Sequence, residues 1–124
     1  MSLKSPLGRV LGLGSAKEGT DHWWMQRVTA VALVPLTLWF VVAIGLADTL
    51  DYASVVYWFS NPVNATLMIL LLGALLYHSS LGVQVVIEDY VRGGAKVVAL
   101  VLSKLVHVGL AVAAVFAVIR VSTG

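Results

Sequence analysis

The sequence predicts an all-α integral membrane protein with three transmembrane helices. Of its 124 residues, 60% are hydrophobic and only 11% are charged, and the mean hydropathy of +0.95 is far above the range of soluble domains. A soluble domain of this length would have too little interior for so many apolar side chains. Three separate stretches also reach the roughly 20 apolar residues that a bilayer-spanning helix needs. Lipid is therefore the expected solvent for most of the chain.

The first 27 residues are expected to form a cytoplasmic N-terminal segment. They mix Pro6, Glu18 and Asp21 with apolar residues ahead of the first apolar run, which is unlike a cleavable signal. They also lack the arginine-rich, acid-poor composition of a transit peptide. The sequence therefore favours a multi-pass protein of a bacterial plasma membrane, with a processed organellar form as the alternative.

The predicted spans cover residues 28–47, 63–87 and 97–119 of a single transmembrane anchor domain. The first two contain no Asp, Glu, Lys or Arg, whereas the third contains Lys104, whose long side chain can extend toward the nearer interface. Pro35 predicts a kink in the first span, because membrane helices tolerate a proline whose freed carbonyl is satisfied by neighbours. Pro62 suits the start of the second span, and Gly93 its end.

The basic residues predict the orientation of these spans. Six of them precede the first span or lie between the second and third: Lys4, Arg9, Lys17, Arg27, Arg92 and Lys96. The 48–62 loop has none and carries Asp48 and Asp51 instead, and only Arg120 opposes the pattern. The positive-inside rule then places the N-terminus in the cytoplasm and the C-terminus on the other side. Residues 52–59, which are rich in aromatic side chains, are expected to form a half-buried helix at the outer interface.

Composition excludes several functions for this chain alone. It has no cysteine, so it cannot form disulfides, thiolate metal sites or an iron–sulfur cluster of its own. It has neither the G-x-G-x-x-G pattern of dinucleotide binding nor a phosphate loop. The net charge of +2 is spread thinly over connecting segments, so nucleic acid is not an expected partner.

Two histidines are the polar residues that most need an explanation at membrane depth. His78 lies nine residues before Ile87, or about 13 Å from the inner end of its span, and Gly82 follows one turn later on the same face. A neutral imidazole beside a missing side chain suits the ligation of a flat haem, and an interhelical hydrogen bond is an equally good interpretation. His107 lies at a similar depth. It either completes a bis-histidine site within the chain or forms a polar seam with Lys104 toward a partner subunit.

Asp89 lies on the same face as His78, eleven residues and roughly 16 Å further toward the cytoplasm, and Tyr90 follows it immediately. A carboxylate and a phenol at the cytoplasmic interface suit a quinone, which needs an apolar slot for its tail and hydrogen-bond donors for its carbonyl oxygens. The alternative is a solvated helix end whose tyrosine belongs to the interfacial aromatic belt.

Together, His78, Gly82, Asp89 and Tyr90 form the pattern H-x3-G-x6-D-Y, which resembles the signature of the smaller hydrophobic membrane anchor of succinate dehydrogenases. The resemblance extends over most of the chain. It includes the segment from His22 to Ala30 and, more weakly, Trp58 and Pro62, which resemble the bacterial members.

The resemblance implies that His78 is one axial ligand of a haem b, with the second ligand from a larger cytochrome b anchor subunit. It implies that Tyr90 donates a hydrogen bond to ubiquinone and that Asp89 helps to relay protons. Arg27 is expected near the haem propionates or, alternatively, beside lipid phosphates. A flavoprotein subunit and an iron–sulfur subunit are the further expected partners, and they carry out the oxidation of succinate.

Three other functions remain open from the sequence. The first is the anchor of a quinol:fumarate reductase, which runs the reverse reaction. The second is a small transporter or channel subunit, which should carry charged residues at the middle of its spans, and the first two spans have none. The third is a non-catalytic structural subunit of another respiratory complex, in which His78 and Asp89 are incidental.

Overall fold

The computed structural model describes residues 15–124, with side chains from Thr20 onward. Lys4, Arg9 and the side chain of Lys17, on which part of the predicted orientation depends, lie outside the described residues. Within this part, the chain forms four helices and no strands: α2 (Ser15–Gly45), α3 (Tyr52–Ser60), α4 (Pro62–Tyr90) and α5 (Gly94–Thr123). Three of them are long and apolar enough to cross a membrane, over Thr20–Gly45, Pro62–Tyr90 and Gly94–Thr123. The predicted all-α class with three spans is confirmed.

The helices extend beyond the apolar stretches that predict them. α2 begins at Ser15, so residues 15–27 of the predicted N-terminal segment continue the first span as helix. α4 includes Asp89 and Tyr90 in its last turn. Hydropathy marks the part of a helix that suits hydrocarbon, whereas backbone hydrogen bonding continues into the interface, which explains the difference.

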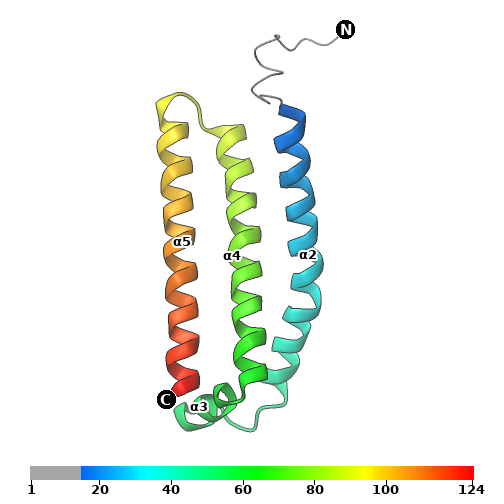
Figure 1. The fold of residues 1–124 in the computed structure, drawn as a ribbon, viewed down its shortest axis with the longest axis vertical. Coiled ribbons are helices and arrows are strands. Elements are labelled where there is room, and N and C mark those ends of the chain that lie inside the picture. The colour runs from blue at the N-terminus through cyan, green and yellow to red at the C-terminus, as the bar shows by residue number, and fades with distance from the viewer. Residues whose placement is uncertain (1–14) are drawn as a thin grey trace.

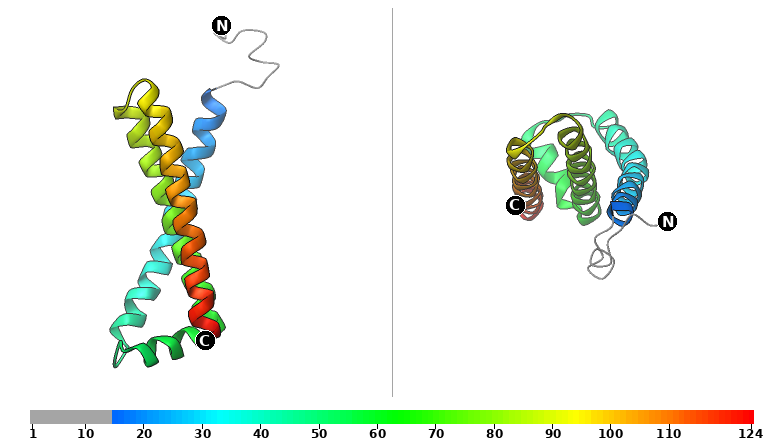
Figure 2. Two further views of the ribbon diagram at one scale, coloured as in Figure 1. Left: turned by 90° about the vertical axis from the view of Figure 1, so that its left-hand side faces the viewer. Right: turned by 90° about the horizontal axis from the view of Figure 1, so that it is seen from above.

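The three long helices stand in a row with α4 in the middle (Figures 1 and 2). α4 packs against α2 on one side and α5 on the other, while α2 and α5 do not contact each other in the described residues. The connection between α4 and α5 lies at the same end as the start of α2, and α3 and the C-terminus lie at the opposite end (Figure 1). α4 therefore presents a different face to each neighbour.

Side-chain caps and one glycine set the helix boundaries. The Asp51 carboxylate accepts a hydrogen bond of 3.0 Å from the backbone N–H of Ser54 and caps α3. Asn61 caps α4 by accepting from the N–H of Val63, and Pro62 occupies the first helical turn. Gly93 has φ of +71°, a left-handed conformation that glycine adopts without strain, and it allows the short turn into α5.

Pro35 lies inside α2 without ending it. The proline ring lacks an N–H, so the carbonyl one turn earlier loses its helical partner. Figure 1 shows α2 bowed near its middle, as predicted for a proline in this span. α2 crosses α4 at an angle, and α3 lies across the end of the bundle where α2 ends (Figure 2).

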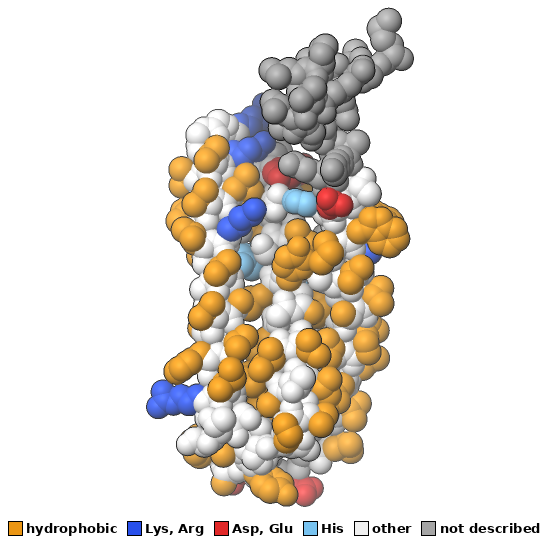
Figure 3. All heavy atoms as spheres, in the orientation of Figure 1, with side chains coloured by type: hydrophobic (Ala, Val, Ile, Leu, Met, Phe, Trp, Pro, Cys, Tyr) orange, Lys and Arg blue, Asp and Glu red, His pale blue; other side chains and the backbone are white. Residues whose placement is uncertain are grey.

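Little of the described chain is buried within it. From Thr20 onward, only five hydrophobic side chains are buried: Ala65, Met68, Leu71, Leu81 and Val118. Four of these form a cluster toward the α3 end, where Trp39 stacks on Trp58 at a centroid distance of 5.4 Å. Hydrophobic side chains cover the middle of the visible face in Figure 3, with most charged ones toward the ends. Lipid or partner subunits must cover this surface.

Candidate functional site

His78 lies on the face of α4 that meets α2. Its Nδ1 is 3.0 Å from the hydroxyl oxygen of Thr29, which also lies 2.8 Å from the carbonyl oxygen of Met25 and 3.1 Å from that of Gln26. The interhelical hydrogen bond weighed in the sequence analysis is therefore present. It uses only one ring nitrogen, because Nε2 has no hydrogen bond to any residue within the part that the structure describes.

Gly82 lies one turn from His78 toward the α4–α5 connection. A Cβ atom built on it would meet no other atom within 4 Å, so packing within this chain does not require a glycine here. Gly73 and Gly109 are equally open. The surface of α4 around Gly82 is thus accessible to a group from outside the chain.

His107 lies on α5, and both of its ring nitrogens make hydrogen bonds. Its Nδ1 is 2.7 Å from the carbonyl oxygen of Ser103, so Nδ1–H donates to that carbonyl. Its Nε2, 3.1 Å from the hydroxyl oxygen of Ser79, then accepts a hydrogen bond from Ser79. Ser79 follows His78 directly, and adjacent helical residues point about 100° apart, so His78 faces Thr29 on α2 while Ser79 faces His107 on α5.

The polar contacts of His107 lie within this chain. One joins α5 to α4 through Ser79, and the other is to Ser103 on α5 itself. A polar seam of Lys104 and His107 toward a partner subunit stays a prediction. Lys104 is exposed and lines, with His22, Tyr77 and His107, a cavity of about 380 Å³. The structure does not bring His107 and His78 together.

Arg27 is exposed in the N-terminal half of α2. Its guanidinium group lies over the ring of Trp23, 5.3 Å from the centroid, in a cation–π contact. It forms no salt bridge or hydrogen bond with the described residues. This contact holds the guanidinium group against the side chain of Trp23 on the same helix. Arg27 precedes Thr29 by two residues along α2.

Asp89 and Tyr90 are the last two residues of α4, and both are exposed, Tyr90 to 82%. Neither side chain makes a hydrogen bond with another described residue, whereas neighbouring Glu88 accepts one of 3.0 Å from Gln84. The two groups lie at the end of α4 that carries the connection to α5. This chain alone does not enclose a site around them.

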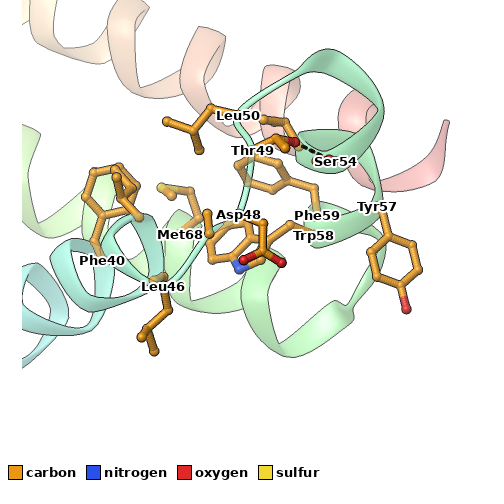
Figure 4. Close-up of a pocket in the computed structure, with 14 residues that line it drawn as sticks. Phe40, Leu46, Asp48, Thr49, Leu50, Ser54, Tyr57, Trp58, Phe59 and Met68 are labelled. Atoms are coloured by element: carbon orange, nitrogen blue, oxygen red, sulfur yellow. Dashed lines mark hydrogen bonds between the residues drawn. The ribbon is translucent and has the colours of Figure 1, made fainter.

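A cavity lies at the other end of the molecule. It has a volume of about 730 Å³ between the end of α2, the following loop and α3. Figure 4 shows Phe40, Trp58 and Phe59 around it, while Tyr57 points away. Asp48 is its only charged lining residue, and the lining contains no histidine. The lining of this cavity contains none of the predicted haem or quinone residues.

No group of three or more His, Cys, Asp or Glu residues that could hold a metal ion occurs among the described residues. A metal centre made wholly of such ligands is therefore not present in this part of the chain. A haem iron has a different requirement, because the porphyrin supplies four of its ligands and the chain needs to supply only one imidazole nitrogen.

Thr29 and Ser79 are the contacts that the sequence reasoning missed. Each is a hydroxyl in an apolar helix, where such groups commonly bond to the carbonyl one turn earlier. The available signal was their position: Thr29 lies next to the first span's start, and Ser79 next to His78. Pairing them with a histidine requires the rotational register of neighbouring helices, which the sequence does not state.

The chain is similar to known proteins over nearly its whole length. The family described as succinate dehydrogenase/fumarate reductase transmembrane subunit matches residues 1–119. The succinate dehydrogenase hydrophobic membrane anchor subunit of Paracoccus denitrificans is 34% identical over 113 residues, which are 91% of this chain and 88% of that protein. The corresponding subunit of Rickettsia bellii is 40% identical over 79 residues, 63% of this chain and 62% of that protein. A succinate dehydrogenase membrane anchor subunit of Reclinomonas americana is 37% identical over 82 residues, 62% of this chain and 67% of that protein.

Proposed function

Because the chain belongs to the family of succinate dehydrogenase/fumarate reductase transmembrane subunits, we propose that it anchors a succinate dehydrogenase in a bacterial plasma membrane. In this proposal the chain binds haem b through His78 and contributes Asp89 and Tyr90 to the site of ubiquinone reduction. The relatives described above are all named for succinate dehydrogenase, which favours succinate oxidation over fumarate reduction. The proposed partners are a larger cytochrome b anchor subunit, an iron–sulfur subunit and a flavoprotein subunit.

The observation that carries the haem assignment is the unpaired Nε2 of His78. An axial ligand must offer the iron a neutral imidazole nitrogen, and in His78 only Nδ1 is engaged. His107 lacks such a nitrogen because both of its ring nitrogens are engaged. When bound, a bis-histidine haem accepts and donates single electrons. The residues present therefore fit the group, with the second ligand from the larger anchor subunit.

Two further residues are proposed to border the haem. Gly82 lies one turn from His78 and leaves the surface of α4 open, which suits packing of the macrocycle edge. Arg27 is proposed to pair with a propionate. The alternative role of Arg27, beside lipid phosphates, needs the same exposed cation. Removal of the haem or of the anionic lipid should therefore distinguish the propionate contact from the lipid contact.

At the end of α4, Tyr90 is proposed to donate a hydrogen bond to a ubiquinone carbonyl oxygen. Asp89 would pass protons to the same oxygen region, since reduction of the quinone consumes two electrons and two protons. Both side chains are exposed in this chain, which supports a site completed by the partner subunits. Succinate itself is oxidised on the flavoprotein, so this chain does no chemistry on succinate.

The exchange of Tyr90 for Phe tests the quinone site. Phe keeps the ring and removes only the hydroxyl, so a defect reports the hydrogen bond to the ligand. A hydrogen bond to an oxygen that gains negative charge strengthens during reduction. We therefore expect the maximal rate to fall by more than the roughly 1 kcal/mol of a neutral hydrogen bond would produce if it were added to the activation barrier. The measurement is succinate-dependent reduction of ubiquinone, compared with reduction of dyes that accept electrons from the soluble subunits.

Tyr57→Phe is the matched control, because Tyr57 is also 82% exposed and lies at the opposite end of the bundle. Dye reduction should be unchanged in both variants, and ubiquinone reduction should fall only in Tyr90→Phe. Equal ubiquinone rates in Tyr90→Phe, Tyr57→Phe and wild type would return Asp89 and Tyr90 to the solvated-helix-end interpretation.

A further inference from the structure

Thr29 is the one polar side chain that is buried among those described, at 7% exposure. It lies where α2 meets α4, and its hydroxyl is within hydrogen-bonding distance of His78 and of two backbone carbonyls. A buried hydroxyl is costly unless it is hydrogen-bonded, so these contacts must share its one proton and its lone pairs between them.

The Thr29 hydroxyl has one proton for three contacts. The nearest of them is the carbonyl oxygen of Met25, at 2.8 Å, which can only accept, so the geometry favours a hydroxyl proton placed on this carbonyl. The hydroxyl oxygen then offers only lone pairs to Nδ1 of His78, 3.0 Å away. A stable contact at this distance requires Nδ1 to carry the proton of the imidazole, which leaves the lone pair on Nε2.

We propose that Thr29 is a positioning residue for the haem ligand. Its hydroxyl oxygen accepts a hydrogen bond from Nδ1–H of His78, which fixes the tautomer and the ring orientation that present Nε2 to the iron. This inference rests on the proposed role of His78 as an axial ligand. Partners that accept the second ring N–H of a metal-bound histidine commonly fix its tautomer and raise its basicity. Here a threonine on a neighbouring helix takes that place.

The hydrogen bond should also affect the haem itself. An imidazole whose N–H is held by an acceptor donates more electron density to iron, which favours the ferric state. The removal of the hydroxyl should therefore raise the midpoint potential of the haem. It should also weaken binding, because loss of such a partner commonly lowers metal affinity about 10- to 100-fold.

The test compares Thr29→Val with Thr29→Ser in the purified complex with all its subunits. Val keeps the shape and removes the hydroxyl, whereas Ser keeps the hydroxyl. We expect Thr29→Val to raise the midpoint potential in an optical redox titration and to release haem to an excess of apomyoglobin about tenfold faster or more. Thr29→Ser should restore both values toward wild type. Ser79→Ala is the matched control, because it removes the hydroxyl that bonds to His107, and both values should stay unchanged.

Two results separate this inference from the proposed function. If His78→Ala removes the haem but Thr29→Val keeps the wild-type potential and release rate, the role of Thr29 is refuted while the ligand assignment stands. If the haem spectrum is intact in His78→Ala, the ligand assignment fails, and the role of Thr29 fails with it.

Discussion

At the scale of single residues, the two buried-span histidines differ in what their neighbours leave free. Thr29 engages one nitrogen of His78, while Ser79 and Ser103 between them engage both nitrogens of His107. The same residue type at a similar depth can therefore serve as a ligand in one place and as an interhelical contact in the other. The difference lies in the hydroxyls and carbonyls within reach.

Asp89 offers a residue-scale test of the proton path. Asp89→Asn keeps the size and hydrogen-bonding capacity of the side chain but cannot carry a proton. We expect ubiquinone reduction by this variant to be slowed, with a larger defect at high pH, where protons from solvent are scarce. The measurement is the pH profile of the ubiquinone-dependent rate, and a profile parallel to that of wild type would remove Asp89 from the path.

Residue type and spacing could predict His78, Gly82, Asp89 and Tyr90 as candidates, because polar groups in or beside an apolar helix need an explanation. Their partners could not be predicted in the same way. Each long helix is apolar around most of its circumference, so no stripe indicates which face of α4 meets α2. The contact between Thr29 and His78 could therefore be identified only from the rotational register of α2 and α4 in the structure.

At the scale of elements, α3 depends on a cap that is sensitive to pH. Hydrogen bonds from Ser54, through its side chain and backbone, and from Thr49 hold the pKa of the Asp51 carboxyl below its ordinary value. A lowered folded-state pKa means that the carboxylate stabilises the folded helix fully at pH values above the ordinary aspartate pKa of about 3.9. That stabilisation is lost as pH falls through the lower folded-state pKa.

Hydrogen exchange can measure this cap in residues 52–60. Protection of the α3 amides, corrected for the intrinsic exchange rate, should decrease in wild type as pH falls through the folded-state pKa of Asp51. Asp51→Asn keeps an acceptor without the titration, so its protection should not show that step, and Asp51→Ala should be less protected throughout. Identical pH profiles in wild type and Asp51→Asn would contradict a role of the charge.

The elements themselves were largely predictable. The aromatic-rich stretch 52–59 predicted a helix, and α3 covers Tyr52–Ser60. The three apolar runs predicted the three long helices, although α2 starts well before its run. Composition reports where lipid is tolerated, and helix ends depend instead on caps such as Asn61 and on turns such as the one at Gly93.

At the scale of the whole molecule, the row of three helices leaves α4 central and most apolar surface uncovered. The α3 end is held by an aromatic and aliphatic cluster, whereas the other half is tied by hydrogen bonds from His78 and His107. Such a chain has almost no interior of its own. Packing against a larger anchor subunit is accordingly part of the proposed function.

Orientation is a further property of the whole molecule that can be tested. The basic residues predict a cytoplasmic N-terminus, which puts Asp89 and Tyr90 near the cytoplasmic face and Gly124 on the opposite side. A reporter that is active only in the cytoplasm should be inactive when fused after Gly124 and active when inserted at Gly93. The reverse pattern would move the proposed quinone site to the wrong face of the membrane.

The central claim is that this chain supplies one haem ligand and that the ligand is His78. Reduced-minus-oxidised spectra of the purified complex test it most directly, with His78→Ala and His107→Ala compared at equal content of the other subunits. The account predicts that the b-type haem signal is lost or severely diminished in His78→Ala, because no neighbouring side chain on α4 can replace the axial nitrogen, and is largely intact in His107→Ala. Equal loss in both variants while the complex still assembles, or an intact signal in His78→Ala, would contradict it.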